Sequence, residues 1–178
     1  SLRGERLEVR GESLPLSEVS HPELQGAAMQ VEAFRSIINP DDKAFANPSS
    51  MIDAIREYCR KTGQPIPETP AEICRCIFDS LALRYRQVFG WLKEFASFDL
   101  NVLHVIGGGS LNKYLTQFTA DACGVKVLAG PQECTAIGNI MLQAKAMGLV
   151  KDIWEMRAII ANSVDMVAYH PSGDKAAW

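Results

Sequence analysis

The sequence predicts an α/β fold that is rich in helices and contains one short pair of parallel strands. Apolar residues recur every three or four positions over long stretches that open with capping residues, a pattern typical of amphipathic helices. Between residues 102 and 129, two short apolar runs flank one such helix. A strand, a helix and a strand in this order form a right-handed crossover, so the two strands should be parallel.

The composition is that of a folded domain and argues against two classes of binding partner. The chain has 178 residues, of which 47% are hydrophobic, enough to bury a sizeable core. Its net charge is −3 and no basic run exceeds two residues, so we expect neither nucleic acid nor an anionic membrane as a partner. No apolar stretch approaches the roughly 20 residues needed to span a bilayer, which makes the cytoplasm the expected location. A start at Ser1 without methionine suggests an expressed fragment.

The first half of the chain begins with a segment of weak pattern. Residues 1–30 are expected to form a loosely ordered leader, with a candidate helix over 22–31. A helix is predicted over 48–61, with Asn47 as its cap and Pro48 in its first position.

The longest helix is predicted to begin at Pro70. Thr69 and Glu72 have the spacing of a capping box. An apolar stripe then recurs in steps of three or four, so this face is expected to pack in the core along its whole length. The stripe comprises Ile73, Ile77, Leu81, Tyr85, Val88, Leu92 and Phe95.

The second half changes to short apolar runs. Residues 102–106 predict a buried strand, in which His104 would be a core histidine, and 125–129 predict a second strand. Ser110 is the expected cap of a helix over 111–122, which Gly124 would end. Further helices are predicted over 133–147 and 152–162, followed by an extended segment and a tail over 173–178.

The five cysteines have irregular spacing and are expected to be buried free thiols. A zinc site at Cys74 and Cys76 is a weaker alternative because no second pair matches it. A disulfide between Cys59 and Cys76 also remains open. His21 and His170 lie in predicted loops, and no acidic residue or cysteine stands near either at a spacing typical of metal ligands. The sequence therefore predicts no metal site there.

The candidate functional motif is a run of three consecutive glycines, Gly107 to Gly109, between a predicted strand and a predicted helix. Glycines in this position allow the backbone to approach a phosphate or a nucleotide, although a tight turn alone would also need them. The chain has no G-x-x-x-x-G-K-[ST] phosphate loop and no G-x-S-x-G elbow. The dinucleotide fingerprint of dehydrogenases fails too. Asn112 replaces its third glycine and Gly130 stands where its ribose carboxylate would be.

A longer match places the glycines in a family. The segment "LHVIGGGSLNKYLTQFTADACGVKVLAGPQECTAIGNIMLQAKAMG" resembles the carboxy-terminal domain signature of FGGY-type carbohydrate kinases. "RSIINPDDKAFANPSSM", "CRKTGQPIPET" and "AEICRCIFDSLALRY" are similar to the L-rhamnulose-specific members of that family. The resemblance implies that residues 31–172 are a partial FGGY carboxy-terminal domain of the actin-like, or ribonuclease H-like, ATPase fold.

The resemblance also implies a function and a site. The family uses ATP with Mg²⁺, and these members phosphorylate L-rhamnulose at its 1-hydroxyl. The matching positions make Gly108 and Asn112 nucleotide contacts, while Gly107 and Gly109 would shape the turn and line the site. Glu133 and Asp121 are expected to be structural, with Glu133 supplying a favourable charge at a helix start.

Parts of the family pattern are missing from the chain. No segment resembles the family's phosphate-gripping hairpin or its sugar site, so the sequence predicts no catalytic residue and no turnover by this chain alone. The sugar would bind only through the missing first domain. The strand group that begins the second domain is also missing, which leaves a sheet edge uncovered. An alternative function is therefore a non-enzymatic interaction module, or an inactive truncated kinase, that self-associates through that edge.

Overall fold

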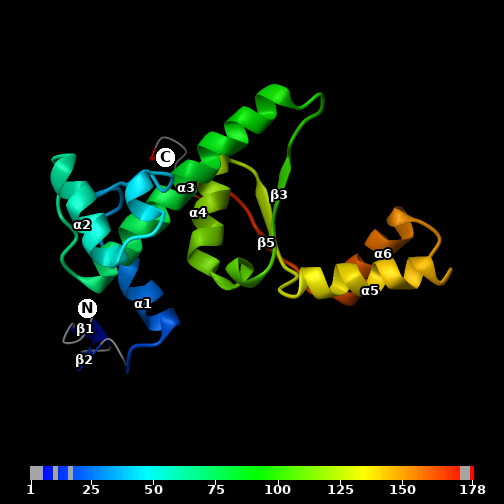
Figure 1. Cartoon of the computed structure of the whole chain (residues 1–178), viewed down its shortest axis with the longest axis horizontal. Coiled ribbons are helices and arrows are strands. Elements are labelled where there is room, and N and C mark those ends of the chain that lie inside the picture. Colours follow the sequence, from blue (N-terminus) through cyan, green and yellow to red (C-terminus); the bar gives the residue numbers. More distant parts are fainter. Residues whose placement is uncertain (1–5, 10–11, 16–17, 173–176) are drawn as a thin grey trace. The chain divides into compact units, whose positions relative to one another are not determined.

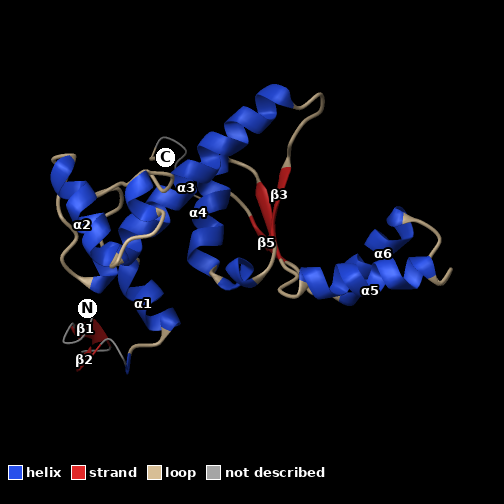
Figure 2. Ribbon diagram, viewed as in Figure 1, coloured by secondary structure: helices blue, strands red, loops and turns tan. Residues whose placement is uncertain are grey.

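The structure, a computed structural model, describes residues 6–9, 12–15, 18–172 and 177–178. The chain divides into two compact units, Ser1–Gln87 and Val88–Trp178, whose boundary falls within the long helix α3 (Pro70–Phe95). Helices predominate in both units (Figure 1, Figure 2), so the expected helix-rich α/β fold is confirmed. No helix among the described residues is long and apolar enough to cross a membrane.

The first unit opens with a strand pair that the sequence did not reveal. Strands β1 (Arg6–Val9) and β2 (Glu12–Pro15) are antiparallel, and helix α1 (His21–Ala28) follows them. These elements lie within the predicted leader over 1–30, whose loose ordering stays a prediction. Most of the predicted tail over 173–178 lies outside the described residues.

Two helices and a turn build the core of the first unit. The 3-10 turn η2 (Lys43–Phe45) precedes α2 (Met51–Lys61). Ser50, not the predicted Asn47, caps α2 by accepting a hydrogen bond from the Asp53 N–H at 3.3 Å. The core joins the loop before η2 to α2 and α3 through apolar side chains. They are Ile38, Ile55, Cys59, Ile73 and Cys76.

Helix α3 begins as predicted. The Glu72 N–H donates to Thr69 Oγ1 at 3.2 Å and the Thr69 N–H donates to Glu72 Oε2 at 3.0 Å, which completes the capping box. The prediction that its apolar stripe is buried along the whole length is wrong. Phe95 is 87% exposed, and Phe89, which lies off the predicted stripe, packs instead against Cys123 and Val125.

The second unit contains the predicted parallel pair and a third strand. Strand β3 (Val102–Val105) is parallel to β4 (Lys126–Ala129), and β5 (Val167–Tyr169) pairs antiparallel with the other edge of β4. Helix α4 (Lys113–Cys123) connects β3 to β4 and packs on the sheet. Helices α5 (Cys134–Ala146) and α6 (Ile153–Ser163) follow, packed on each other around Met141, Val150 and Met156.

Strand β3 is not buried on both faces. Val102 is 41% exposed and His104 is exposed, so the prediction of a core histidine is wrong. Residues paired across the sheet share a face, and Leu103 lies on the same face as the fully buried Val127. His104 lies on the opposite face with Leu128 and is accessible there.

Candidate functional site

The glycine turn, defined here as Gly107 to Gly109, follows directly from the carboxyl end of β3. Gly107 has φ 75° and ψ −166°, a conformation that residues with a side chain rarely adopt. The 3-10 turn η3 (Gly108–Leu111) begins at the next residue. Ser110 closes the turn, since its N–H and its Oγ both donate to the Gly107 carbonyl, at 3.0 and 2.7 Å.

The glycine turn leaves room for a ligand. A Cβ atom added at any of the three glycines would have no heavy atom within 4 Å apart from its chain neighbours. Within the described residues, the N–H groups of Gly108 and Gly109 make no hydrogen bond. The turn therefore presents two backbone donors and an unobstructed approach, which suit an anionic or oxygen-rich ligand.

Asn112 lies between this turn and helix α4. Its Oδ1 accepts a hydrogen bond from the Leu115 N–H at 3.1 Å, so Asn112 is the cap of α4 and the prediction that Ser110 caps this helix is wrong. Ser110 lies within η3, two residues before this cap, and its hydroxyl donates to the Gly107 carbonyl. The Asn112 Nδ2 amine makes no hydrogen bond among the described residues, so one donor is available at the start of the helix.

A neighbouring loop supports the turn from behind. The Gly107 N–H donates to the Pro131 carbonyl at 3.0 Å, and the Gly130 N–H donates to the Val105 carbonyl at 2.8 Å. Gly130 is buried and has φ 116°. The loop thus holds the chain on both sides of the junction between β3 and the glycine turn.

Glu133 and Asp121, the two other residues considered, lie where structural roles are expected. Glu133 is exposed at the start of α5, as a helix N-terminal charge would be, and makes no side-chain capping bond. Asp121 is buried on α4, where its Oδ1 accepts a hydrogen bond from the Ser172 N–H at 2.7 Å. Sequence patterns did not reveal this bond, because its partners are 51 residues apart.

All five cysteines are free thiols, as predicted, but the prediction that all are buried is wrong, because Cys74 and Cys134 are partly exposed. Burial raises the pKa of Cys74 to about 11 and that of Cys76 to about 12, so both are neutral near pH 7. Among the described residues, no group of three His, Cys, Asp or Glu side chains could hold a metal ion.

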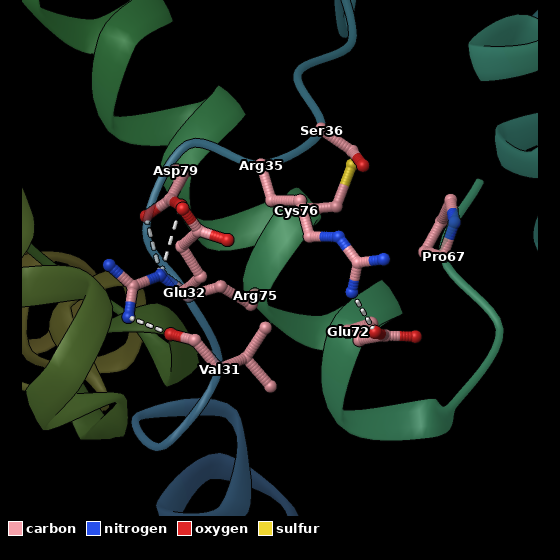
Figure 3. Close-up of a pocket in the computed structure, with 9 residues that line it drawn as sticks. All are labelled: Val31, Glu32, Arg35, Ser36, Pro67, Glu72, Arg75, Cys76 and Asp79. Carbon is pink, nitrogen blue, oxygen red and sulfur yellow. Dashed lines mark hydrogen bonds and ion pairs between the residues drawn. The ribbon is translucent and has the colours of Figure 1, made fainter. Parts of the chain in front are cut away.

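The first unit contains a small polar cavity of about 10 Å³, shown in Figure 3. Arg35 pairs with Glu72 at its wall, and Arg75 pairs with Asp79. This volume is room for about one water molecule, so the cavity is too small for a nucleotide or a sugar. This cavity is therefore no rival to the glycine turn as the candidate site.

Known proteins share much of this sequence. The model of the FGGY family of carbohydrate kinases, C-terminal domain, matches residues 5–147, a segment that begins upstream of the predicted domain start at residue 31. A rhamnulokinase of Bacteroides thetaiotaomicron is 55% identical over 161 residues, which cover 90% of this chain and 33% of that protein. Rhamnulokinases of Pectobacterium carotovorum subsp. carotovorum and Pectobacterium atrosepticum are each 47% identical over 148 residues.

Those two alignments cover 83% of this chain and 30% of each relative. The chain thus spans about a third of the length of the curated relatives it matches. The family model matches well over half of the chain and includes the glycine turn, Asn112 and the start of α5. The chain belongs to the FGGY family of carbohydrate kinases, of which it contains the C-terminal domain region.

Proposed function

We propose that this chain is the nucleotide-binding part of an ATP-dependent kinase that phosphorylates L-rhamnulose to L-rhamnulose 1-phosphate. Family membership supports a carbohydrate kinase, and the names of three relatives point to rhamnulose. The observation that carries the nucleotide site is the glycine turn. It has two N–H donors without a partner within the described residues, and no atom lies near the positions that added Cβ atoms would take.

Each residue of the proposed site has a separate task. The N–H groups of Gly108 and Gly109 bind oxygens of the nucleotide. The positive φ of Gly107 allows the backbone to change direction where the turn begins. Asn112 caps α4 with Oδ1 and offers Nδ2 to the adenosine. We propose that Mg²⁺ arrives bound to the phosphates of the nucleotide, where it neutralises their charge.

No residue of this chain is proposed as the catalytic base. In a complete kinase, the remaining two thirds of the protein would supply the sugar site and the group that accepts the proton of the sugar hydroxyl. Phosphoryl transfer depends on positioning and charge stabilisation, so a nucleotide half-site alone gives no turnover. Release of ADP that depends on added sugar, measured with the purified chain, would contradict this.

Calorimetric titration with Mg-ADP tests the nucleotide site. We expect the chain to bind, and a Gly108→Asp variant, whose carboxylate would repel the phosphates, to lose binding. Asn101→Asp is the matched control, because it adds the same charge to an exposed residue at the opposite end of β3. Equal binding by the chain and by Gly108→Asp would refute the assignment, as would no binding by any of the three proteins.

A second candidate function rests on the outer edge of β3. Among the described strands, β3 pairs only with β4, and the flanking Ile106 is 55% exposed. Such an edge can pair with a second copy of the chain, as a self-associating, non-enzymatic module would. Sedimentation would then show a dimer, and a Val102→Lys variant, whose charge opposes strand pairing, would be monomeric. A monomeric parent chain would exclude this candidate.

A further inference from the structure

The segment that follows α6 contacts the loop behind the proposed site, and it lies outside the region that the family model matches. We call residues 164–172 the brace; they lie beyond the matched residues 5–147. We propose that the brace positions the glycine turn, and that Asp121 and Gln117 are the positioning residues that fasten it. The inference rests on the proposed nucleotide site. It adds that the C-terminal segment sets the backbone conformation of that site.

The brace first covers an edge of the sheet. Its strand β5 pairs antiparallel with β4, with Ala129 opposite Val167 and Val127 opposite Tyr169. This edge of β4 would otherwise present unpaired N–H and carbonyl groups. Pairing fixes the path of the chain up to the residue before Gly130.

The brace next touches the loop behind the glycine turn. A Cβ atom added to Gly130 would lie 3.2 Å from the carbonyl oxygen of Asp165 and 3.7 Å from Cγ of Met166. The backbone of the brace therefore packs directly against the Gly130 backbone, at a distance that would make a tight contact with a Cβ atom. Movement of the brace away from β4 would release this loop.

From Gly130 the contact continues to the turn. The Gly130 N–H is bonded to the Val105 carbonyl, just before the turn, and the Pro131 carbonyl accepts from the Gly107 N–H, the first residue of the turn. Gly107 is a glycine and can adopt many backbone conformations, so contacts such as the bond to Pro131 help to select the observed one. Losing the bond to Pro131 would let Gly107 rotate and redirect the N–H groups of Gly108 and Gly109.

A polar clamp on α4 fastens the far end of the brace. Asp121 Oδ1 accepts from the Ser172 N–H at 2.7 Å, and Gln117 Nε2 donates to the His170 carbonyl at 2.8 Å. The Gln117 amine also donates to Asp121 Oδ1 at 3.0 Å, so the two side chains orient each other. Asn112, beside the turn, caps the same helix, so α4 contacts the brace through Gln117 and Asp121 and adjoins the proposed site at its N-cap.

Amide hydrogen exchange without nucleotide tests the positioning role. In Gln117→Ala and Asp121→Ala, we expect the Gly107 and Gly130 amides to exchange about tenfold faster or more, while amides of α2 and α5 keep their rates. Asp121→Asn keeps an acceptor for the Ser172 N–H and should restore most of the protection. Ser163→Ala, at an exposed serine on α6, is the control that should change nothing. Gln117→Ala serves if Asp121→Ala does not fold, because Gln117 is only half-buried.

Titration with Mg-ADP completes the test. We expect the clamp variants to bind about tenfold more weakly than the parent chain. Faster exchange at residues 168–172 with unchanged exchange at Gly107 would overturn the inference, as would clamp variants that bind Mg-ADP like the parent. If Gly107 responds but no protein binds Mg-ADP, the positioning contact stands and the proposed nucleotide function fails. The two failures are thereby distinguished.

Discussion

Each unit of the chain holds a distant backbone segment with a buried aspartate on a helix. In the first unit, Asp79 Oδ2 accepts from the Phe34 N–H at 2.8 Å. In the second unit, Asp121 Oδ1 accepts from the Ser172 N–H at 2.7 Å. A residue four positions earlier on the same helix assists in both cases, Arg75 in α3 and Gln117 in α4. Each helper also donates to a backbone carbonyl of the held segment, that of Val31 or His170.

The two arrangements differ in the charge of the helper and in what they hold. Asp79 is fully buried and its carboxylate faces the guanidinium of Arg75 (Figure 3). It holds Phe34 at φ 58°, an uncommon conformation for a bulky residue. Asp121 works with a neutral amide and holds Ser172, which is exposed. The comparison indicates that the charged arrangement is part of the first unit's core, whereas the neutral one fastens a surface segment.

Removing each aspartate is the strongest test of this difference. Asp79→Ala removes the carboxylate that faces Arg75, whose side chain is only 11% exposed, and should lower the local free energy of unfolding by about 3–5 kcal/mol. Asp121→Ala leaves a backbone N–H without an acceptor and should lower it by about 1–3 kcal/mol. Hydrogen exchange measures both, since it reports each unit separately. Equal losses in the free energy of unfolding would show that the charged and the neutral arrangement contribute equally to stability.

Substitution of two glycines sharpens the comparison within the second unit. Gly130→Ala should destabilise it by about 1–3 kcal/mol, because φ is 116° and the Asp165 carbonyl lies 3.2 Å from the new Cβ. Gly108→Ala is the matched control. No atom lies within 4 Å of its Cβ, and we expect a change within about 0.5 kcal/mol. Thermal unfolding of the two variants measures the difference, and similar losses would mean that the brace does not press on Gly130.

Helix caps provide a smaller test in each unit. Asn112→Ala removes the cap of α4, and Ser50→Ala removes the cap of α2; each should cost about 1 kcal/mol in urea unfolding. Of these two caps, Asn112 is the one that belongs to the proposed nucleotide site. Asn112→Asp keeps an oxygen for the Leu115 N–H but has no Nδ2 donor, so it should remain stable and bind Mg-ADP more weakly. Unchanged binding by this variant would remove Asn112 from the proposed site.

The features that the sequence predicted correctly are those set by neighbouring residues. The Thr69 capping box, the end of α4 at Gly124 with φ 66°, and the parallel pair all follow from patterns a few residues long or from one crossover. The glycine turn was predicted for the same reason. Ser110 was misassigned because the local pattern did not reveal the 3-10 turn η3, which includes Ser110 and delays the start of α4 to Lys113.

The features that were missed depend on residues far apart in the chain. Strand β5 has three residues and becomes a strand only by pairing with β4. The bonds of Asp79 and Asp121 span 45 and 51 residues, and nothing in the local pattern announces them. His104 was assigned to the core because its run is apolar, but burial depends on whether another element covers that face of the sheet.

Lowering the pH should have the smallest effect on stability, and this prediction concerns Glu72 in the first unit. Burial alone would raise the pKa of Glu72, but hydrogen bonds from the Thr69 and Glu68 N–H groups and the nearby Arg35 outweigh it, so the pKa lies below its ordinary 4.5. A carboxyl with a lowered pKa in the folded state stabilises the protein above the unfolded pKa, and this contribution is lost as the pH falls below about 4.5. Exchange protection at the start of α3 should therefore decline in acid more steeply in the parent chain than in Glu72→Gln, which cannot titrate. Because Glu72 is far in sequence from Asp121, the same variant should leave the acid response of the brace unchanged. A parallel loss at residues 168–172 would show that the two units do not respond separately.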